Sequence, residues 1–161
     1  MDIAIIFAMD EELKAFLNLH RNYETEPFKG RTLYFLNNGP HTITVIRSGI
    51  GKTHSAYVTT MLMHHRKPDI LLNVGVAGGL SVPLGTLVIG TRSAYHDVDV
   101  TAFNYPYGQI PGAPEAFEAD GRLLESFRNG LRSMGDPYDE GTILTGDHFV
   151  QERKQIEKAL D

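Results

Sequence analysis

The chain has 161 residues, of which 42% are hydrophobic, and this length suffices for one domain with a substantial core. It contains no cysteine, which excludes disulfides and thiolate metal sites. Its net charge of −5 argues against nonspecific binding to nucleic acid or to an anionic membrane, and because no stretch resembles a signal peptide or a membrane span, we expect a cytoplasmic protein without either partner.

The N-terminal third predicts a strand, a helix and a hairpin in that order. Ile3–Met9 is a short continuous apolar run, which is typical of a strand covered on both faces. The acidic triplet Asp10–Glu12 follows, and helical spacing begins with it, where the helix dipole favours carboxylates. Thr32–Leu36 and Thr42–Ile46 are rich in β-formers and flank Asn-Asn-Gly-Pro, which predicts the hairpin.

Strands and helices alternate along the rest of the chain, except for a proline-rich loop at Tyr105–Phe117. The predicted elements are a helix from Thr53 to Lys67, strands at Asp69–Val74, Thr86–Ile89, Ala94–Val100 and Thr142–Thr145, a helix at Gly121–Met134, and helical propensity at Gln151–Asp161. This alternation predicts an α/β fold with a twisted, mixed but mostly parallel central sheet flanked by helices.

Glycine-rich segments follow three of the predicted strands, after Ile46, after Val74 and at Gly146. In open α/β sheets the ligand crevice lies outside the carboxyl ends of the strands. These loops, together with Met9–Glu12 at the end of the first strand, are therefore the candidate binding elements.

One segment, RSGIGKTHSA at Arg47–Ala56, contains the Gly-Lys-Thr of a phosphate-binding P-loop. A P-loop also needs a glycine five residues before Gly51, and that position is Ile46. A β-branched residue cannot adopt the open backbone conformation that the loop requires. A triphosphatase is therefore excluded.

Several candidate groups have a structural and a functional interpretation that the residues alone do not separate. The acids at Asp10–Glu12 suit a solvated helix start, or one of them holds a water as general base. Gly49–Gly51 and the glycines at Gly75–Gly79 suit tight turns and packing, or close approach of the backbone to a ligand. Phe149 suits a core position, or stacking on a base at the crevice.

A metal site at His96–Asp99 is a weaker hypothesis. On a strand, Asp97 and Asp99 would share one face, but no third and fourth ligands occur at credible spacing. We therefore expect no metal.

The assembled motifs resemble the 5′-methylthioadenosine/S-adenosylhomocysteine nucleosidase family, within the purine nucleoside phosphorylase superfamily. The matching stretches are IAIIFAMDEEL, SGIGK, KPDILLNVGVAGGL, YHDVDVTAF with YGQIPG, and TGDHF. They occur in family order, at near-family spacing, across almost the whole chain. The most specific is YHDVDVTAFNYPYGQIPG, which is peculiar to the nucleosidase branch.

The resemblance implies hydrolysis of the N-glycosidic bond of methylthioadenosine and S-adenosylhomocysteine, releasing adenine and a thioribose, without metal or organic cofactor. It makes Glu12 the carboxylate that positions and activates water. The substrate-binding residues that it implies are Met9, Ile50, Val76, Ala77 and Gly78 around the ribose and base, Phe103 and Pro111 in the alkylthio pocket, and His148, Phe149 and Val150 at the adenine. Phe149 would stack on the base and the Val150 backbone would read its edge.

The resemblance further implies a homodimer, because in the family the neighbouring subunit completes the alkylthio pocket. Family chains also continue into segments that carry a ribose-binding glutamate and an adenine-protonating aspartate, which no stretch here matches. We therefore expect residues 1–161 to form a single nucleosidase-like domain that lacks the family's C-terminal strands and helix. Alone, this domain would be weakly active or inactive.

Three positions depart from the family pattern: Phe7 replaces a glycine, Val76 a hydroxyl residue and His148 a small residue. Three other functions stay open. A phosphorylase of the superfamily would need phosphate-binding arginines. Here Arg47 alone is insufficient, and the acids at Asp10–Glu12 would repel phosphate. A futalosine hydrolase would differ only in the sugar substituent, and a non-catalytic nucleoside-binding module would need no acid.

Overall fold

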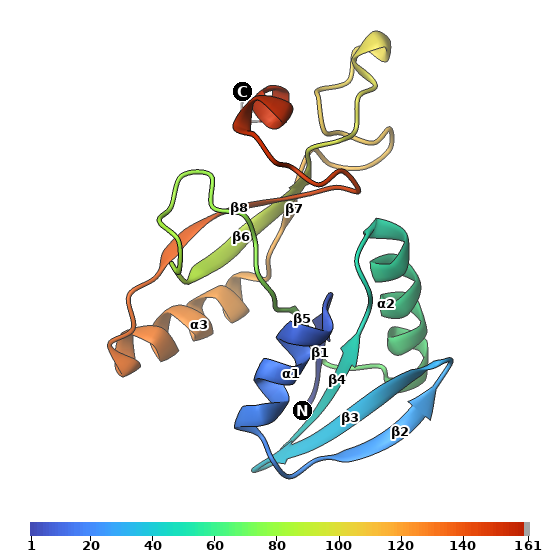
Figure 1. Ribbon diagram of the computed structural model, residues 1–161, viewed down its shortest axis with the longest axis vertical. Coiled ribbons are helices and arrows are strands. Elements are labelled where there is room, and N and C mark those ends of the chain that lie inside the picture. The colour runs from blue at the N-terminus through green and yellow to red at the C-terminus, as the bar shows by residue number, and fades with distance from the viewer. Residues whose placement is uncertain (160–161) are drawn as a thin grey trace. The chain divides into compact units, whose positions relative to one another are not determined.

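The apolar run near the N-terminus forms the centre of a five-stranded mixed sheet in a computed structural model that describes residues 1–159. Strand β1 (Asp2–Phe7) pairs in parallel with β4 (His41–Arg47) on one side and with β5 (Ile70–Asn73) on the other. β3 (Arg31–Asn38) pairs antiparallel with β4 and with β2 (Glu24–Phe28), which gives the order β2-β3-β4-β1-β5 (Figure 1).

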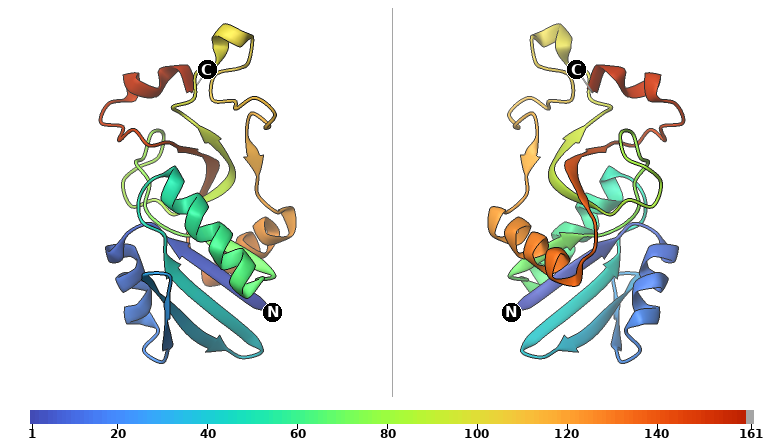
Figure 2. Two further views of the ribbon diagram at one scale, coloured as in Figure 1. Left: turned by 90° about the vertical axis from the view of Figure 1, so that its right-hand side faces the viewer. Right: turned by 90° about the vertical axis from the view of Figure 1, so that its left-hand side faces the viewer.

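Two helices cover opposite faces of this sheet, because successive β1 side chains point to opposite sides. Ile5 and Phe7 pack with Leu13 of α1 (Asp10–Leu19), and Ala4 and Ile6 pack with Val58 and Leu62 of α2 (Lys52–Arg66). Figure 2 shows the sheet between the two helices. Both clusters are nearly closed to solvent, so the end of β1 is held in a rigid three-layer unit.

The second part of the chain forms a three-stranded sheet of order β7-β6-β8. Its strands are β6 (Val88–Tyr95), β7 (Phe117–Glu118) and β8 (Asp139–Thr145), and α3 (Gly121–Met134) connects β7 to β8. Two short 3₁₀ helices lie at Thr101–Phe103 and Arg153–Ala159. Met1–Val76 and the residues from Ala77 onward are two compact units, and the expectation of a single domain stays a prediction.

The mixed α/β fold with helices flanking a sheet is as expected, and most predicted elements are present. The strands predicted at Thr86–Ile89 and Ala94–Val100 are wrong in detail. The separate strands at Thr86–Ile89 and Ala94–Val100 are one strand, β6, which pairs with β8 through a bulge between Gly90 and Arg92 and ends at Tyr95. The polar residues at the centre of β6 interrupted its apolar pattern, and a bulge further disturbs the two-residue alternation.

Strand β2 was not predicted, because its residues Glu-Thr-Glu-Pro-Phe lack the apolar pattern of a strand. It pairs only with β3 in the described sheet, and such an edge position tolerates Pro27. At the other end of the chain, the helical propensity predicted for Gln151–Asp161 becomes the 3₁₀ helix at Arg153–Ala159, and residues 160–161 lie outside the described part. None of the helices within residues 1–159 has the length and apolarity needed to cross a membrane.

Candidate active site

The Glu12 carboxylate, at the start of α1, is bound by three backbone N–H groups. Its Oε2 accepts hydrogen bonds from Ala8 N at 3.0 Å and Met9 N at 2.9 Å. Its Oε1 accepts one from Val76 N at 2.9 Å, across 64 positions of sequence. The first two bonds cap the helix N-terminus, as a glutamate at its third position often does. The third bond ties the end of β1 to the segment that follows β5.

The acid triplet therefore divides into two roles. Asp10 and Glu11 are exposed, as the solvated helix-start interpretation requires, whereas Glu12 is half-buried and turned toward the sheet edge. A carboxylate offers about four lone-pair positions, and among the described residues the three N–H donors use two on Oε2 and one on Oε1. The geometry leaves one acceptor position on Oε1, which suits a hydrogen bond from a water molecule.

Gly75 makes this arrangement sterically possible. A Cβ atom placed on Gly75 would lie 3.1 Å from Glu12 Cδ and 2.7 Å from Glu12 Oε1, and the second distance is shorter than a Cβ atom normally comes to any other atom. Gly75 and Gly79 both fit the packing interpretation of the glycine cluster, and close approach of its backbone to a ligand stays a prediction. Gly75 lies against the Glu12 carboxylate, whereas Gly79 is crowded by the Val82 carbonyl, where a Cβ would be only 2.8 Å away. Sequence reasoning did not identify Gly75 or the Ala8 N–H as parts of this site.

Phe7, which departs from the family pattern, does not project into the Glu12 site. It is 2% exposed and packs in the core beneath α1, with its ring centroid 5.5 Å from that of Phe16. Arg47, at the end of β4, is engaged locally: its Nε lies 2.8 Å from Asp10 Oδ1. Its charge is therefore largely balanced by a carboxylate at the same sheet edge.

The segment Ser48–Gly51 connects β4 to α2 and carries Ile50. Gly49 and Gly51 have φ angles of 88° and 101°, a region that residues with side chains rarely adopt, so both glycines are required by the turn itself. Ile50 is 70% exposed, and its carbonyl is 2.9 Å from His54 Nδ1. Met9 and Val76 are thus joined to Glu12 through their backbones, whereas the role of Ile50 as a ligand contact stays a prediction.

The predicted adenine-binding residues follow β8 in the second unit. Phe149 is 82% exposed, so the alternative of a core aromatic is wrong. His148 Nε2 is 3.4 Å from Gln155 Nε2, and the Gln155 amide oxygen accepts hydrogen bonds from Gln151 N and Glu152 N at 2.7 and 2.8 Å. Val150 is half-buried. The three residues therefore share one short segment that carries an open phenyl face.

The remaining predicted residues are exposed. Phe103 ends the 3₁₀ helix at Thr101–Phe103 with 74% exposure, and Pro111 lies in the loop that follows. Ala77 and Gly78 lie in the irregular segment after β5, where a side chain on Gly78 would meet open space. Their roles as ligand contacts stay predictions.

The residues at His96–Asp99 are not on a strand, so the two aspartates do not share a strand face as the metal hypothesis assumed. Asp99 Oδ1 accepts hydrogen bonds from Thr101 Oγ1 at 2.7 Å and Thr101 N at 3.2 Å, and these bonds lower the pKa of its carboxyl. Within residues 1–159, no group of three or more histidine or acidic side chains is placed to hold a metal ion.

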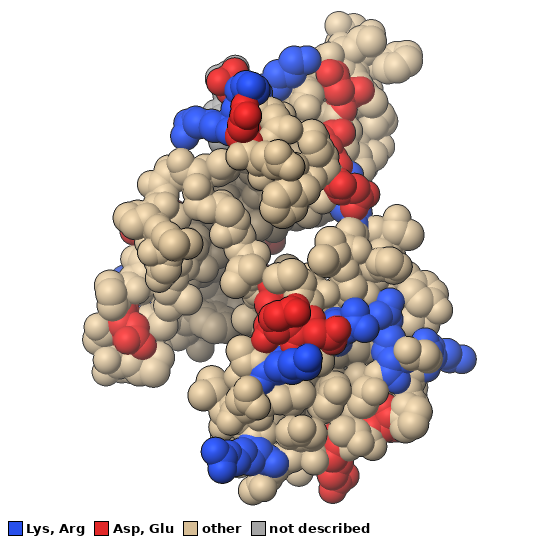
Figure 3. All heavy atoms as spheres, viewed as in Figure 1, with Lys and Arg blue, Asp and Glu red and all other residues tan. Residues whose placement is uncertain are grey.

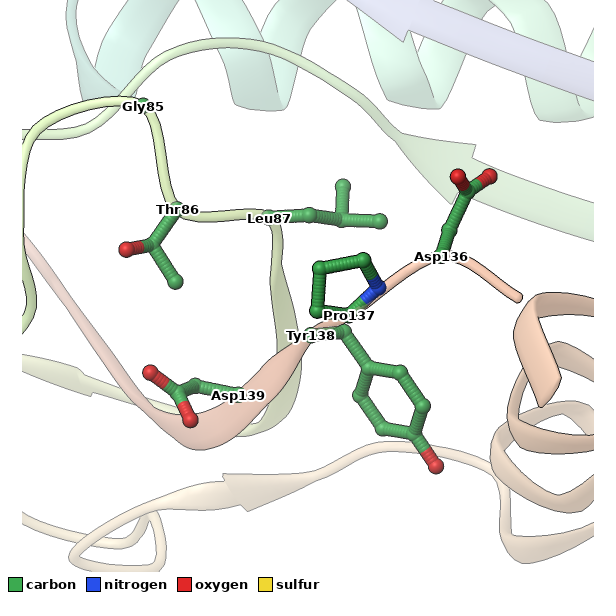
Figure 4. Close-up of a pocket in the computed structure, with 7 residues that line it drawn as sticks. All are labelled: Gly85, Thr86, Leu87, Asp136, Pro137, Tyr138 and Asp139. Atoms are coloured by element: carbon green, nitrogen blue, oxygen red, sulfur yellow. The ribbon is translucent and has the colours of Figure 1, made fainter.

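No predicted site residue lines either of two cavities found among residues 1–159. A cavity of about 360 Å³ is lined by Gly85, Thr86, Leu87, Asp136, Pro137, Tyr138 and Asp139, and one of about 270 Å³ is lined by His20, Arg21, Asn22, Leu36, Asn37, Asn38 and Ile43. In the first, the side chains of Asp136, Tyr138 and Asp139 point in different directions (Figure 4). No polar groups converge there, so Glu12 is the better candidate for chemistry.

Comparison with known proteins defines the class of protein to which the chain belongs. A family model described as the phosphorylase superfamily matches residues 2–161. A 5′-methylthioadenosine/S-adenosylhomocysteine nucleosidase of an Exiguobacterium species is 38% identical over 167 residues, covering 99% of this chain and 70% of that protein.

Two solved structures are similar along the same length. S-adenosylhomocysteine nucleosidase of Streptococcus pyogenes, solved with 5-methylthiotubericidin, has a TM-score of 0.88 and 34% identity over 98% of this chain and 68% of its own. Futalosine hydrolase of Helicobacter pylori has a TM-score of 0.91 and 30% identity over 98% and 69%. The chain therefore belongs to the phosphorylase superfamily and, within it, to the 5′-methylthioadenosine/S-adenosylhomocysteine nucleosidase family. The members of this nucleosidase family are enzymes that hydrolyse the N-glycosidic bond of nucleosides.

Proposed function

We propose that the chain hydrolyses the N-glycosidic bond of 5′-methylthioadenosine and S-adenosylhomocysteine, with Glu12 activating the attacking water. The observation that carries the proposal is the carboxylate held by three N–H groups from Ala8, Met9 and Val76, with an acceptor position left on Oε1. A carboxylate fixed by backbone donors keeps its orientation during the reaction, and a fixed orientation is what a general base needs.

The proposed reaction is a water-for-adenine exchange at the anomeric carbon. The bond from that carbon to the purine nitrogen breaks, and the sugar passes through an oxocarbenium-like state that a nearby carboxylate stabilises. Water forms the new carbon–oxygen bond and gives one proton to Glu12. Adenine leaves readily only when its imidazole nitrogen gains a proton, and the resemblance assigns that proton to an aspartate that no stretch of these 161 residues matches.

We assign the substrate contacts as the resemblance implies. Met9, Ile50 and Val76–Gly78 would bind the ribose and base, and Phe103 and Pro111 would accept the apolar alkylthio group. Phe149 would stack on adenine beside His148, and the Val150 backbone would read the purine edge. The 82% exposure of Phe149 supports the stacking role, because an apolar ring that faces solvent is unfavourable unless a ligand covers it.

The direct test of the substrate is adenine release from methylthioadenosine, S-adenosylhomocysteine and futalosine, offered separately to the protein in phosphate-free buffer. We expect release from the first two and little from the third. Faster cleavage of futalosine would assign the chain to the second function, which the similarity to the Helicobacter pylori hydrolase favours.

Phosphate distinguishes hydrolysis from phosphorolysis. The pairing of Arg47 with Asp10 at 2.8 Å supports hydrolysis, because a guanidinium already bound to a carboxylate is a poor anchor for a phosphate dianion. We expect the rate of adenine release to be the same with and without phosphate. Release that depends on phosphate and yields a sugar phosphate would assign the chain to the phosphorylases.

We propose that these 161 residues alone turn over substrate slowly or not at all, and that they function as a homodimer in the cytoplasm. Calorimetry with adenine, run beside the turnover assay, separates a slow enzyme from a nucleoside-binding module. Binding without any turnover would favour the module.

A further inference from the structure

The segment Gly146–Val150, which leaves β8 and carries the proposed adenine contacts, is tied to a neighbouring segment that the reaction does not use. Asp97 Oδ2 accepts a hydrogen bond from Asp147 N at 2.8 Å, across 50 positions of sequence. His96 N donates to Thr145 O at 3.0 Å and continues the pairing of β6 with β8 beyond the last strand residue. Two successive residues, one through its backbone and one through its carboxylate, thus fix the exit from the strand.

The same two residues leave no room for a side chain at Gly146. A Cβ atom there would lie 2.6 Å from His96 Nε2, 2.7 Å from His96 Cε1 and 2.7 Å from Asp97 Cγ. His96 is buried, with 7% of the residue exposed, and so cannot easily move aside. Gly146 is therefore packed directly on His96 and Asp97, and any displacement of that pair displaces the backbone that leads to Phe149.

The supporting pair is fixed in turn by the loop beneath it. Tyr107 Oη donates to the His96 carbonyl at 3.1 Å, and Gly108 N donates to the Val98 carbonyl at 2.9 Å. Gly108 is itself closely packed, since a Cβ atom there would be 2.6 Å from the Tyr95 carbonyl oxygen. All of these contacts join residues of the second unit.

We propose that Asp97 is a positioning residue for purine recognition: its carboxylate, together with His96 packed on Gly146, holds the segment Gly146–Val150 in the conformation that contacts the base. This inference rests on the proposed function of that segment. A carboxylate bonded to a backbone N–H is a strong anchor, and the far end of the segment is held separately by Gln155. A segment fixed at both ends binds a flat ligand without first having to be ordered.

The test is equilibrium calorimetry with adenine and hypoxanthine, which differ at the purine edge. The ratio of the two affinities does not depend on the fraction of protein that is folded, so it moves only if the reading of the edge changes. Asp97→Leu removes the acceptor, and we expect adenine affinity to fall at least 10-fold and the adenine-to-hypoxanthine ratio to approach one. Asp97→Asn keeps an oxygen acceptor for Asp147 N, and we expect it to restore both.

Gly146→Ala and Gly141→Ala form a matched pair for the case in which Asp97→Leu does not fold. A Cβ atom at Gly141, on β8, would meet open space, so Gly141→Ala should match the wild type. Gly146→Ala should lose the preference for adenine over hypoxanthine. Wild-type affinity and discrimination in Asp97→Leu or Gly146→Ala would overturn the inference. Failure of the wild-type protein to bind adenine would instead overturn the purine site itself, and the inference with it.

Discussion

Glu12 combines a structural and a proposed chemical role in one side chain. Its Oε2 caps α1 through Ala8 N and Met9 N, a role that any capping glutamate fills. Its Oε1 contacts Val76 N, which no helix cap requires. The helix cap holds one oxygen in place, and the other is thereby directed to the strand ends, where α/β proteins bind their ligands.

Gly75→Ala tests this arrangement without touching the carboxylate. The added Cβ would lie 2.7 Å from Glu12 Oε1, so the carboxylate or the backbone must shift by several tenths of an ångström. A misplacement of this kind costs up to about 10²-fold in rate. We expect a loss of adenine release approaching that size, with little change in melting temperature, measured beside Gly130→Ala as the control.

Gly130 is a suitable control because it lies in α3 and a side chain there would meet open space. Unchanged turnover in Gly75→Ala would show that the rate does not depend on the observed position of Oε1.

Among the elements, the regular ones followed from sequence and the irregular ones did not. The bounds predicted for α3 are those observed, because Asp120 before it and Gly135 after it are clear start and stop signals. β2 carried no apolar pattern, and the bulged β6 read as two strands. Local propensity identifies caps and periodic faces, whereas an edge strand exists only because a neighbour supplies its hydrogen bonds.

The candidate site divides in the same way. The acids at Asp10–Glu12 and the glycine-rich strand ends could be named from residue type, and the family resemblance singled out Glu12 among the acids. The partners of Glu12 could not, because Ala8, Met9 and Val76 act through backbone N–H groups that every non-proline residue has. The tie from Asp97 to Asp147 spans 50 positions, and no local pattern indicates it.

The cap of α3 gives a pH-dependent test at this scale. Asp120 Oδ1 accepts hydrogen bonds from Arg122 N at 2.9 Å and Leu123 N at 3.2 Å, and the bond from Leu123 N is the main cause that lowers the pKa of its carboxyl. A lowered folded-state pKa means that this stabilisation is complete above the unfolded-state value of 3.8 and is lost as pH falls through the folded-state pKa.

We therefore expect Asp120→Ala to have a lower melting temperature than the wild type near neutral pH, and the difference to shrink as the pH is lowered below 3.8. Thermal unfolding followed by circular dichroism measures both. Asp120→Asn, which also caps helices but does not titrate, should stay close to the wild type near neutral pH. A difference that grew at low pH would contradict the assignment.

For the whole molecule, charge and exposed apolar surface bear on assembly. Lys, Arg, Asp and Glu side chains are interspersed on the face shown in Figure 3, where opposite charges partly cancel one another's fields. Large apolar side chains are exposed in both units, among them Ile50 and Tyr57 in the first and Phe103 in the second. Such side chains, where they gather, mark surfaces that bind partners or ligands.

We predict a solution mass about twice the 17.9 kDa of one chain, measured by sedimentation equilibrium across a range of concentrations. Apolar contacts should make the association insensitive to salt, so the same mass is expected at low and high ionic strength. A mass of one chain at all concentrations would show that the homodimer implied by the resemblance does not form from these residues.

The most direct test of Glu12-assisted hydrolysis is to compare adenine release from methylthioadenosine by the wild type and by Glu12→Gln. The protein concentration exceeds the substrate concentration in both assays, and adenine binding is measured in parallel. We predict slow release by the wild type, a loss of about 10²-fold or more in Glu12→Gln, and similar adenine affinity in the two proteins. Equal rates of release in the two proteins would contradict it.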